Sequence, residues 1–440
     1  MSSPHQQPAP EQQGRSRIRA RIPGGWATGE APRPEIEFFA FPQIEGDAGF
    51  VPNMVGVLNP FEGGLHEFSA LAQGNLFAQF EDLQVIDVGW WERDAGPARS
   101  LVTSRSENGR VLIGIEYLFI EDGWAVQLTA TLTPPAYRAL RPLFDGIAAS
   151  AAVADHTGPA AGGAVMDQAI RLDEVASAAV GQPCERLDSV RGMGVYRSEG
   201  PVLSTEALEL LVNLAHGNRP GRLAGTTPAM AELQEAGLMA DHQPTEEAGP
   251  ILDLLAEPAA QITVQAHRGE TATDFQAWFD GSHAVIAAGP PAGYLDHDEV
   301  AHVGQSGYRQ LDLMSTEQLP AALFAWAGAG PAWVLFPETE TMSQERLMSH
   351  WTAVAPAPSA GAVDTAVWAE PWFIWTLNAT GAASRLDEVV RVTAGDRGTY
   401  RLFQAEPDEG GSRPVSLHPE PPQVIFEHLL GTVSGLVGAR

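Results

Sequence analysis

The C-terminal part of the chain changes from helical periodicity to strand alternation. Apolar residues three and four positions apart over 204–217 predict an amphipathic helix, with Ser204 as its N-cap. Thr227 precedes a second helical pattern, which Gly237 ends because glycine adopts the left-handed conformation that closes a helix. A third helix is expected over 249–256. Three helices therefore precede the first strand of this region.

Strand signals begin at 261–266, where polar and apolar residues alternate. Asp280-Gly281 predicts a hairpin with a two-residue turn. Ser315 and Gln318 form a capping-box pattern before a helix that runs through Trp326, and an apolar stretch over 332–336 predicts a buried strand.

Strands followed by a helix occur twice, over 261–327 and again over about 370–435. A period near 110 residues indicates two related sub-domains and not a solenoid. We expect sub-domains at about 200–340 and 341–440.

The N-terminal region, residues 16–150, is rich in strand patterns and contains helical patterns at 65–80 and 134–150. Asp122-Gly123 predicts the turn between its last two strands. This composition favours an antiparallel sheet covered by helices, and therefore an α+β fold.

Segments around this domain have different compositions. Residues 1–15 have almost no apolar content and are expected to be disordered. Residues 151–165 are small and uncharged, as in a linker. Residues 166–200 have a helical pattern at 166–180 and a strand pattern at 192–198. We group 166–440 as the second domain.

Charge excludes one class of partner. The formal net charge is −29, from 55 acidic and 26 basic residues, and every basic residue is Arg. Nucleic acid is not an expected partner, because phosphate binding needs concentrated positive charge. The acidic balance is also unfavourable for anionic membranes, and the longest uncharged stretch, 319–336, is broken by Gly-Ala-Gly-Pro, so no membrane insertion is expected.

The chain contains one cysteine, Cys184, which excludes an internal disulfide and fits a reducing compartment. The N-terminus has no apolar segment typical of a signal peptide, so a cytoplasmic location is expected.

Local motifs for catalysis are weak. Residues 296–302 include Asp296, His297, Asp298, Glu299 and His302, but the spacing is not His-Glu-x-x-His and an acidic loop explains it equally. The sequence around Ser306 is not Gly-x-Ser-x-Gly. We expect no metal, no cofactor and no catalytic residues, and hence no enzyme, although a site assembled in three dimensions stays open.

Aromatic residues on predicted strands are the candidate binding residues: Trp278, Phe279, Trp372, Phe373 and Trp375. Alternation places Phe373 and Trp375 on one face of a strand and Trp372 on the other. Such a strand is either buried on both faces or presents an apolar patch to a protein partner.

Residues 200–440 resemble the EspG family, the cytosolic chaperones of mycobacterial type VII (ESX) secretion. The resembling segments are the predicted helices at 204–223 and 231–241, the helix and strand at 251–266, the hairpin at 277–290, and the segments 385–403 and 423–436. The resemblance implies two similar halves about a pseudo-twofold axis, and PE/PPE helical pairs as substrates, held through the tip of their bundle.

Residues 16–150 resemble the Mog1/PsbP-like group, which includes LpqN-type lipoproteins and the effector-loading chaperones of type VI secretion. The cues are Ile-Pro-Gly-Gly-Trp at 22–26, the strand at 50–57, and the run from 96–99 into paired strands and a last helix. The group implies no shared catalytic residues.

Together these features favour a cytosolic chaperone or adaptor of a type VII-like secretion system. Its expected partner is a secreted helical effector, PE/PPE-like or WXG100-like, whose apolar surface it covers before export. The alternative is a toxin-binding immunity or accessory protein, and the third possibility is an unrecognised enzyme.

Overall fold

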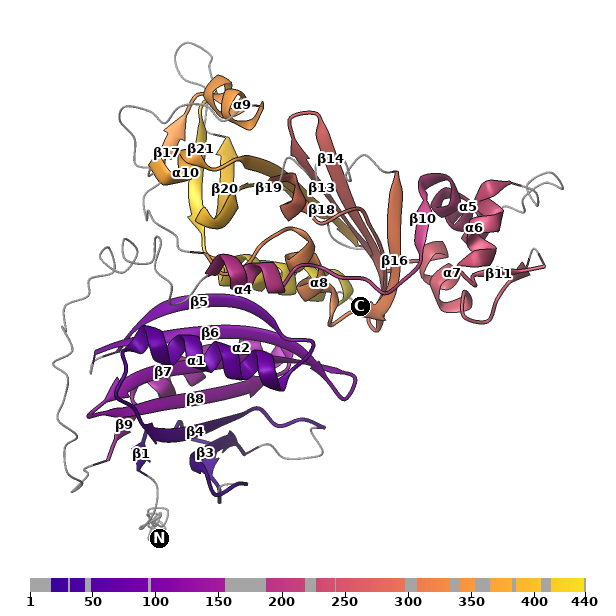
Figure 1. The fold of residues 1–440 in the computed structure, drawn as a ribbon. Helices are drawn as coiled ribbons and strands as arrows, with labels where there is room; N and C mark the ends of the chain where they lie inside the picture. The colour runs from indigo at the N-terminus through magenta and orange to yellow at the C-terminus, as the bar shows by residue number, and fades with distance from the viewer. Residues whose placement is uncertain are drawn as a thin grey trace, which may run out of the picture. The chain divides into compact units, whose positions relative to one another are not determined.

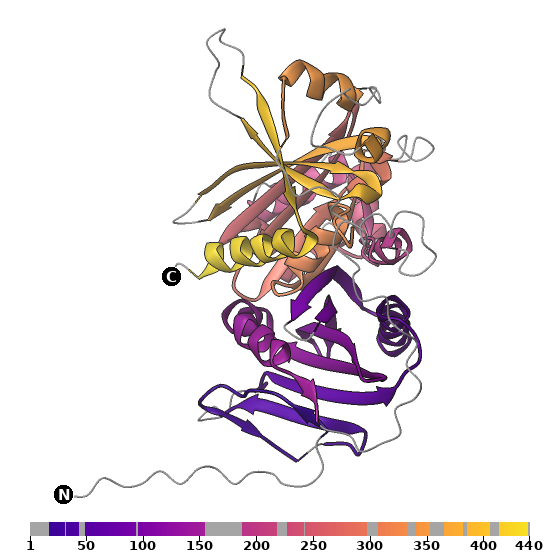
Figure 2. The ribbon, with the colours of Figure 1, turned by 90° about the vertical axis from the view of Figure 1, so that its left-hand side faces the viewer.

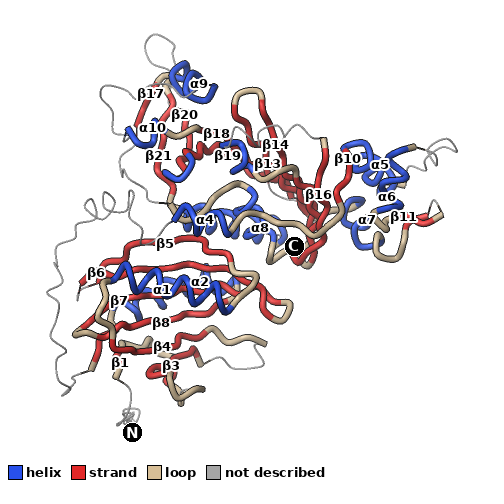
Figure 3. Tube along the Cα trace, viewed as in Figure 1, coloured by secondary structure: helices blue, strands red, loops and turns tan. Residues whose placement is uncertain are grey.

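The fold is mixed α+β, with antiparallel sheets covered by helices (Figures 1 and 3). A computed structural model describes residues 17–30, 32–43, 49–93, 96–154, 187–217, 227–241, 243–296, 307–332, 340–352, 365–381, 385–404 and 413–438. Two compact units make up the chain: most described residues up to 154 form the first, and those from 187 onward, with 76–88 and 102–111, belong to the second. The predicted tail at 1–15, most of the predicted linker and the helix pattern at 166–180 lie outside the described residues.

The N-terminal sheet has seven strands in the order β2-β3-β4-β8-β7-β6-β5. Its strands are β2 (Trp26–Thr28), β3 (Ile36–Pro42), β4 (Asn53–Pro60), β5 (Gln84–Arg93), β6 (Gly96–Glu107), β7 (Arg110–Glu121) and β8 (Trp124–Leu132). Helix α1 (Leu65–Gln79) and helix α2 (Pro134–Ala149) lie on opposite sides of this sheet (Figure 2). A two-stranded pair, β1 (Ile18–Arg19) with β9 (Ala152–Val153), accompanies it.

Two tight turns fix the long central hairpins of this sheet. Asp122 and Gly123 both have positive φ, and Glu121 pairs with Trp124 across the turn, as the sequence predicts. Asn108 and Gly109 adopt the same left-handed conformation between β6 and β7. Successive positive-φ residues match the twist of the flanking strands, so they hold the register of β6, β7 and β8.

The C-terminal unit contains a sheet of ten strands in the order β10-β16-β15-β14-β13-β18-β19-β20-β21-β17, with antiparallel pairing throughout. The strands are β10 (Val202–Ser204), β13 (Ala260–Arg268), β14 (Thr271–Phe279), β15 (His283–Ala288), β16 (Tyr308–Ser315), β17 (Glu340–Met342), β18 (Trp372–Gly381), β19 (Arg385–Ala394), β20 (Thr399–Gln404) and β21 (Val415–Glu420). The helices are α4 (Leu187–Met193), α5 (Thr205–Ala215), α6 (Pro228–Glu235), α7 (Gly249–Ala256), α8 (Leu319–Trp326), α9 (Gln344–Thr352), α10 (Thr365–Ala369) and α11 (Pro422–Val437). Two short 3-10 turns are η2 (Ala292–Asp296) and η4 (Gly395–Arg397). A separate two-stranded pair consists of β11 (Met239–Ala240) and β12 (Gln243–Pro244).

This sheet consists of two halves with the same order of elements. In the first, β10 leads into α5–α7, four strands β13–β16 follow, and α8 ends the series. In the second, β17 leads into α9 and α10, four strands β18–β21 follow, and α11 ends the series. In the first half, β10 pairs with β16, and in the second half, β17 pairs with β21. The two halves are joined by the pairing of β13 with β18. The described residues thus repeat one order of elements, and the sub-domains at about 200–340 and 341–440 stay a prediction.

Alternation along the strands gives the sheet two different faces. Face A carries Val264, Phe275 and Leu377, all fully buried, and it is covered by α8 and α11, which contact each other through Phe324 and Phe426. On face B, the described helices pack toward the two ends of the sheet. There α5–α7 pack on β15 and β16 in one cluster, and α9 and α10 pack on β18–β21 in another.

Several predicted caps are present. Ser204 Oγ accepts the backbone N–H of Ala207, and Thr227 Oγ1 accepts that of Met230. Gly237 has φ +73, and the N–H of Leu238 donates to the carbonyl of Leu233. Helix α7 occupies the predicted 249–256.

Two local predictions are wrong. The turn of the β14–β15 hairpin is Gly281-Ser282, one residue later than predicted, because Asp280 N–H bonds His283 O and its carboxylate accepts from the N–H groups of Ser282 and His283. The strand predicted at 192–198 is absent: α4 extends to Met193 and the chain then runs unpaired to Gly200. Residues 333–336, predicted as a strand, lie outside the described residues.

Strand β10, at the edge of the ten-stranded sheet in its first half, has a protected outer edge. The N–H groups of alternate residues face β16, as shown by Thr205 N–H donating to Gly307 O. Ser204 N–H points to the opposite side and donates to the carboxylate of Glu232 on α6, at 2.8 Å. An acidic side chain therefore occupies a position where another strand would otherwise pair.

We predict that Gly237→Ala destabilises the C-terminal unit by about 1–2 kcal/mol, because an L-residue resists the left-handed conformation. No atom lies within 4 Å of an added Cβ there, so the penalty is conformational and not steric. Urea unfolding followed by tryptophan fluorescence measures it. Gly249→Ala is the matched control: it also has open space but no positive φ, and it should leave stability unchanged or raise it slightly.

Candidate functional site

The predicted aromatic binding residues are used for packing. Phe279, Trp372, Phe373 and Trp375 are each at most 1% exposed. Trp278 is half-buried and packs against the α5–α7 cluster. The predicted alternation is present, since Phe373 and Trp375 lie on face A and Trp372 on face B. The four buried side chains are therefore core residues and present no surface to a partner in this conformation, because helices cover both faces of the sheet where they lie.

Trp372 belongs to a closed aromatic cluster on face B. The ring of His350, from α9, lies edge-on to Trp368 at 4.9 Å and to Trp372 at 4.2 Å between centroids. His350 is 1% exposed, and its Nε2 lies 3.2 Å from the carbonyl oxygen of Glu370. Trp372 Nε1 donates to Val367 O. These contacts attach α9 and α10 to the second half of the sheet.

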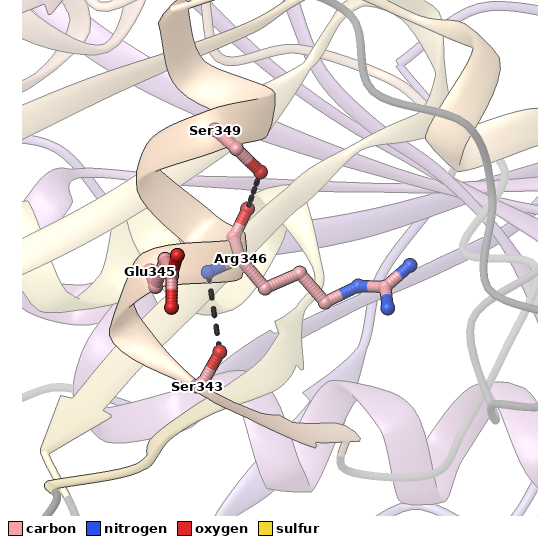
Figure 4. A pocket seen from close by; sticks show the side chains of 4 residues that line it. All are labelled: Ser343, Glu345, Arg346 and Ser349. Carbon is pink, nitrogen blue, oxygen red and sulfur yellow. Dashed lines mark hydrogen bonds between the residues drawn. The ribbon is translucent and has the colours of Figure 1, made fainter.

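A shallow depression of about 410 Å³ lies beside this cluster and is lined by Ser343, Glu345, Arg346 and Ser349 (Figure 4). Ser343 Oγ accepts from Arg346 N–H, and Ser349 Oγ donates to Arg346 O, so both hydroxyls bond the helix backbone. The guanidinium of Arg346 lies over the ring of Trp368, at 4.9 Å, and its side chain extends away from the two serines. The depression therefore lacks converging ligand groups.

A buried ionic network lies on face A in the second half. Arg391 of β19 is fully buried and bonds Glu420 of β21 through Nε at 2.6 Å and Nη2 at 3.1 Å. Its Nη2 also lies 3.0 Å from Nδ1 of His428 on α11. The guanidinium stands over Trp375, 4.8 Å from the ring centroid. Three elements are thus joined by one cation.

The network fixes the protonation state of His428. A guanidinium has only donors, so Nδ1 of His428 must accept, which requires a neutral imidazole with its proton on Nε2. Burial, and after it the positive charge of Arg391, lower the pKa of His428 from the ordinary 6.5. Sequence analysis did not identify Arg391, Glu420 or His428, because they lie far apart along the chain and in no local motif.

A second polar anchor ties the segment after α4 to the first half. The hydroxyl of Tyr196 donates to the carboxylate of Asp312 on β16, and Ser198 Oγ donates to the other carboxylate oxygen at 2.6 Å. Burial, followed by the negative charge of Asp312, raises the pKa of Tyr196 well above its ordinary value. The Tyr196 ring also contacts Phe275 edge-on. This tyrosine stays protonated and serves as a structural donor.

The N-terminal unit has buried polar groups with comparable roles. Glu116 is 2% exposed and accepts from Gln127 Nε2 at 2.8 Å and Thr129 Oγ1 at 2.5 Å. Tyr117 donates to Asp145 of α2, and burial together with this carboxylate raises the pKa of Tyr117. These bonds satisfy groups inside the sheet and at its helix.

Within the described residues, the centre of face B lies outside both the α5–α7 cluster and the α9–α10 cluster. We name it the central floor: it comprises the face-B side chains of β13 and β18, which form three cross-strand pairs. The pairs are Gln261 with Thr380, Thr263 with Asn378, and Gln265 with Thr376. Four of the six are exposed and the two remaining are partly exposed.

The central floor contains amides and hydroxyls only. In a chain of net charge −29, six neighbouring surface positions without a carboxylate or a cation form a chemically distinct area. On β14 it borders Trp278 of the α5–α7 cluster and Asp274, which forms an ion pair with Arg309, and on β19 it borders Arg385. The alternation of polar and apolar residues over 261–266 and 372–380 indicates these polar surface positions. The predicted binding residues were instead the aromatic residues of the second strand, which are buried.

Most of the other candidate residues lie outside the described residues. Of the polar cluster at 296–302, only Asp296 is described, and Ser306 and Cys184 lie outside the described residues. Within the described ranges no three His, Cys, Asp or Glu residues are grouped for metal binding. None of the described helices is long and apolar enough to cross a membrane.

Comparisons with known proteins give likenesses of fold. No family model and no curated protein matches the chain. Among solved structures, it is similar to LpqN, involved in cell envelope biogenesis of Mycobacterium tuberculosis, with 18% identity over 31% of this chain and 83% of that one, at a TM-score of 0.27. It is also similar to cyanobacterial PsbP from Synechocystis, with 14% identity over 33% and 98% of the two chains and a TM-score of 0.24.

A protein of unknown function from Pseudomonas aeruginosa is similar at 14% identity over 31% of this chain and 82% of that one, with a TM-score of 0.22. LpqN and PsbP belong to the groups that residues 16–150 resemble in sequence. Because the TM-scores are below 0.5, these likenesses assign no family and no activity.

We predict that Glu420→Leu alone destabilises the C-terminal unit by about 3–5 kcal/mol, because it leaves the buried Arg391 without its carboxylate. The double variant Arg391→Met with Glu420→Leu should recover most of that loss, since apolar side chains of similar volume replace a buried ion pair at little cost. Urea unfolding of the two variants tests this, and equal destabilisation of both would contradict it.

Proposed function

We propose that the protein is a cytosolic chaperone or adaptor of a type VII-like secretion system, which binds a secreted helical effector on face B of its ten-stranded sheet. The observation that supports the proposal is the central floor, whose polar side chains lie, among the described residues, outside the two helical clusters of face B, while α8 and α11 pack on face A. The EspG resemblance of 200–440 and its two related halves support it. A Mog1/PsbP-like N-terminal domain supports the same class, because that group includes effector-loading chaperones.

The chemistry of the floor suits the turn of a helical hairpin. Helix ends leave backbone N–H and C=O groups without partners, and amide side chains both donate and accept. Uncharged side chains also cost less to desolvate than charged ones when a partner covers them. A PE/PPE-like or WXG100-like effector presents such a turn, so we expect it to contact Gln261, Thr263 and Asn378.

The aromatic residues of the two strands then have a structural role. The buried tryptophans hold the sheet and its helices together, while the half-buried Trp278 lies beside the floor on the same face. The effector's apolar surface would then be covered by the helical clusters at the edge of the floor, and the floor itself would hold the polar turn. Recognition by hydrogen bonds predicts a weak dependence of binding on salt.

We predict that the tagged full chain, recovered from its native host, carries a small helical protein in stoichiometric amount. Gln261→Arg with Asn378→Arg should reduce the recovered partner at least about tenfold, because two cations would be buried at the interface without partners. Mass spectrometry and quantitative gel analysis measure it. Gln243→Arg, at an exposed position of β12 outside the floor, is the matched control and should recover as much partner as wild type.

Recovery of the chain alone, under conditions in which candidate effectors are expressed, would contradict the chaperone proposal. Undiminished recovery by the floor variant would instead contradict the assignment of the surface. Both variants should keep the wild-type circular dichroism, since the altered side chains are exposed.

A further inference from the structure

The two halves of the ten-stranded sheet hold their covering helices by different interactions. Helix α8 has the sequence Leu-Pro-Ala-Ala-Leu-Phe-Ala-Trp, with no titratable side chain, and its Trp326 Nε1 donates to Gly289 O. Helix α11 occupies the corresponding place in the second half, and its His428 contacts the ion pair of Arg391 and Glu420. The first half shows that a helix docks on face A without buried charge.

The ionic network is therefore not required for docking as such. A buried ion pair contributes little stability compared with apolar side chains of the same volume, because both charges must be desolvated. Helix α11 already buries Ile425, Phe426, Leu429, Leu430, Val433 and Leu436. A polar contact in one half only, beside an extensive apolar interface, indicates a role other than adhesion.

We infer that α11 is a proton-sensitive clasp: protonation of His428 in mildly acidic conditions releases the first turns of α11 from face A, while α8 stays in place. This inference is independent of what the sheet binds. It follows from the donor and acceptor capacities of the two groups. A protonated imidazole has no acceptor, so it would lose the bond from Arg391 Nη2 and place two cations 3.0 Å apart.

The surroundings of His428 leave few compensating groups. Arg391 of β19 and Arg401 of β20 oppose its protonation, and Glu420 of β21 favours it. Both carboxylate oxygens of Glu420 already bond Arg391. Helix α8 and strand β18, which also contact α11, present no titratable side chain.

The direction of the pH dependence follows from linkage. The folded protein holds the pKa of His428 below 6.5, so the unfolded or released state takes up the proton first as the pH falls. The stabilisation is fully present above about 6.5 and is lost as the pH falls through the lower pKa of the folded state. Release would expose Phe426, which now contacts Phe324 of α8.

The test is hydrogen exchange of the full chain at about pH 7.5 and about pH 5.5, corrected for intrinsic exchange rates. Protection of the amides of 423–430 should fall about tenfold or more at the lower pH, because the released state takes up a proton that the docked state disfavours. Protection of 319–326 in α8 should stay within about threefold, which provides a control inside the same molecule. An equal response of the two helices would overturn the inference.

Variants separate the clasp from general acid sensitivity. His428→Gln keeps an acceptor for Arg391 but has no titration, so it should abolish the additional response of α11. His216→Gln, at the exposed C-cap of α5, is the matched control and should keep it. If His428→Gln does not fold, the triple variant Arg391→Met with Glu420→Leu and His428→Leu removes the titrating imidazole together with the ion pair, and it should likewise abolish the response. Retention of the wild-type response in the variant tested would overturn the clasp.

Discussion

The antiparallel pairing of β13 with β18 is the interaction on which the C-terminal unit depends. These strands are the innermost of their halves, and eight consecutive pairs from Ala260–Gly381 to His267–Ile374 join them. Without this ladder each half would be a small sheet with an exposed edge, at β13 in the first half and at β18 in the second. With it, the two halves share one continuous face A, and α8 and α11 contact each other across the junction. The register also places the central floor, because the same pairing that aligns Val264 with Leu377 on one face aligns Thr263 with Asn378 on the other.

Much of the local structure could be predicted from the sequence, because its causes are local. Caps such as Ser204 and Thr227, the left-handed Gly237 and the turn at Asp122-Gly123 depend on a few neighbouring residues. The order of strands and helices along the sequence also predicts the repeated order of elements that the sheet has. The β14–β15 turn was misplaced by one residue because the Asp280 carboxylate bonds two backbone N–H groups ahead of it, which ends the ladder later than the Asp-Gly pattern indicates.

The site could not be predicted in the same way, because burial depends on residues distant in sequence. Trp372 and Trp375 are equally apolar, and the sequence alone does not show whether a helix covers each face. Helices α9 and α10 cover one and α11 the other, so both tryptophans are buried. The polar residues Thr376, Asn378 and Thr380 follow these tryptophans on the face of β18 that carries Trp372. Arg391 and His428 are 37 residues apart, and only the packing of α11 brings them together.

The carboxylate of Glu232 at the edge strand β10 has a consequence for the evolution of the sheet. Duplication enlarges a sheet by joining equivalent edges, and here the innermost strands of the two halves form that junction. The opposite edge of the first half has its outward N–H at Ser204 occupied by a side chain of its own helix. A further copy of the unit would have to displace that carboxylate before it gained its first backbone hydrogen bond. The architecture is therefore closed at two repeats on this side, which distinguishes it from open-ended repeat proteins and from sheets that assemble into fibres.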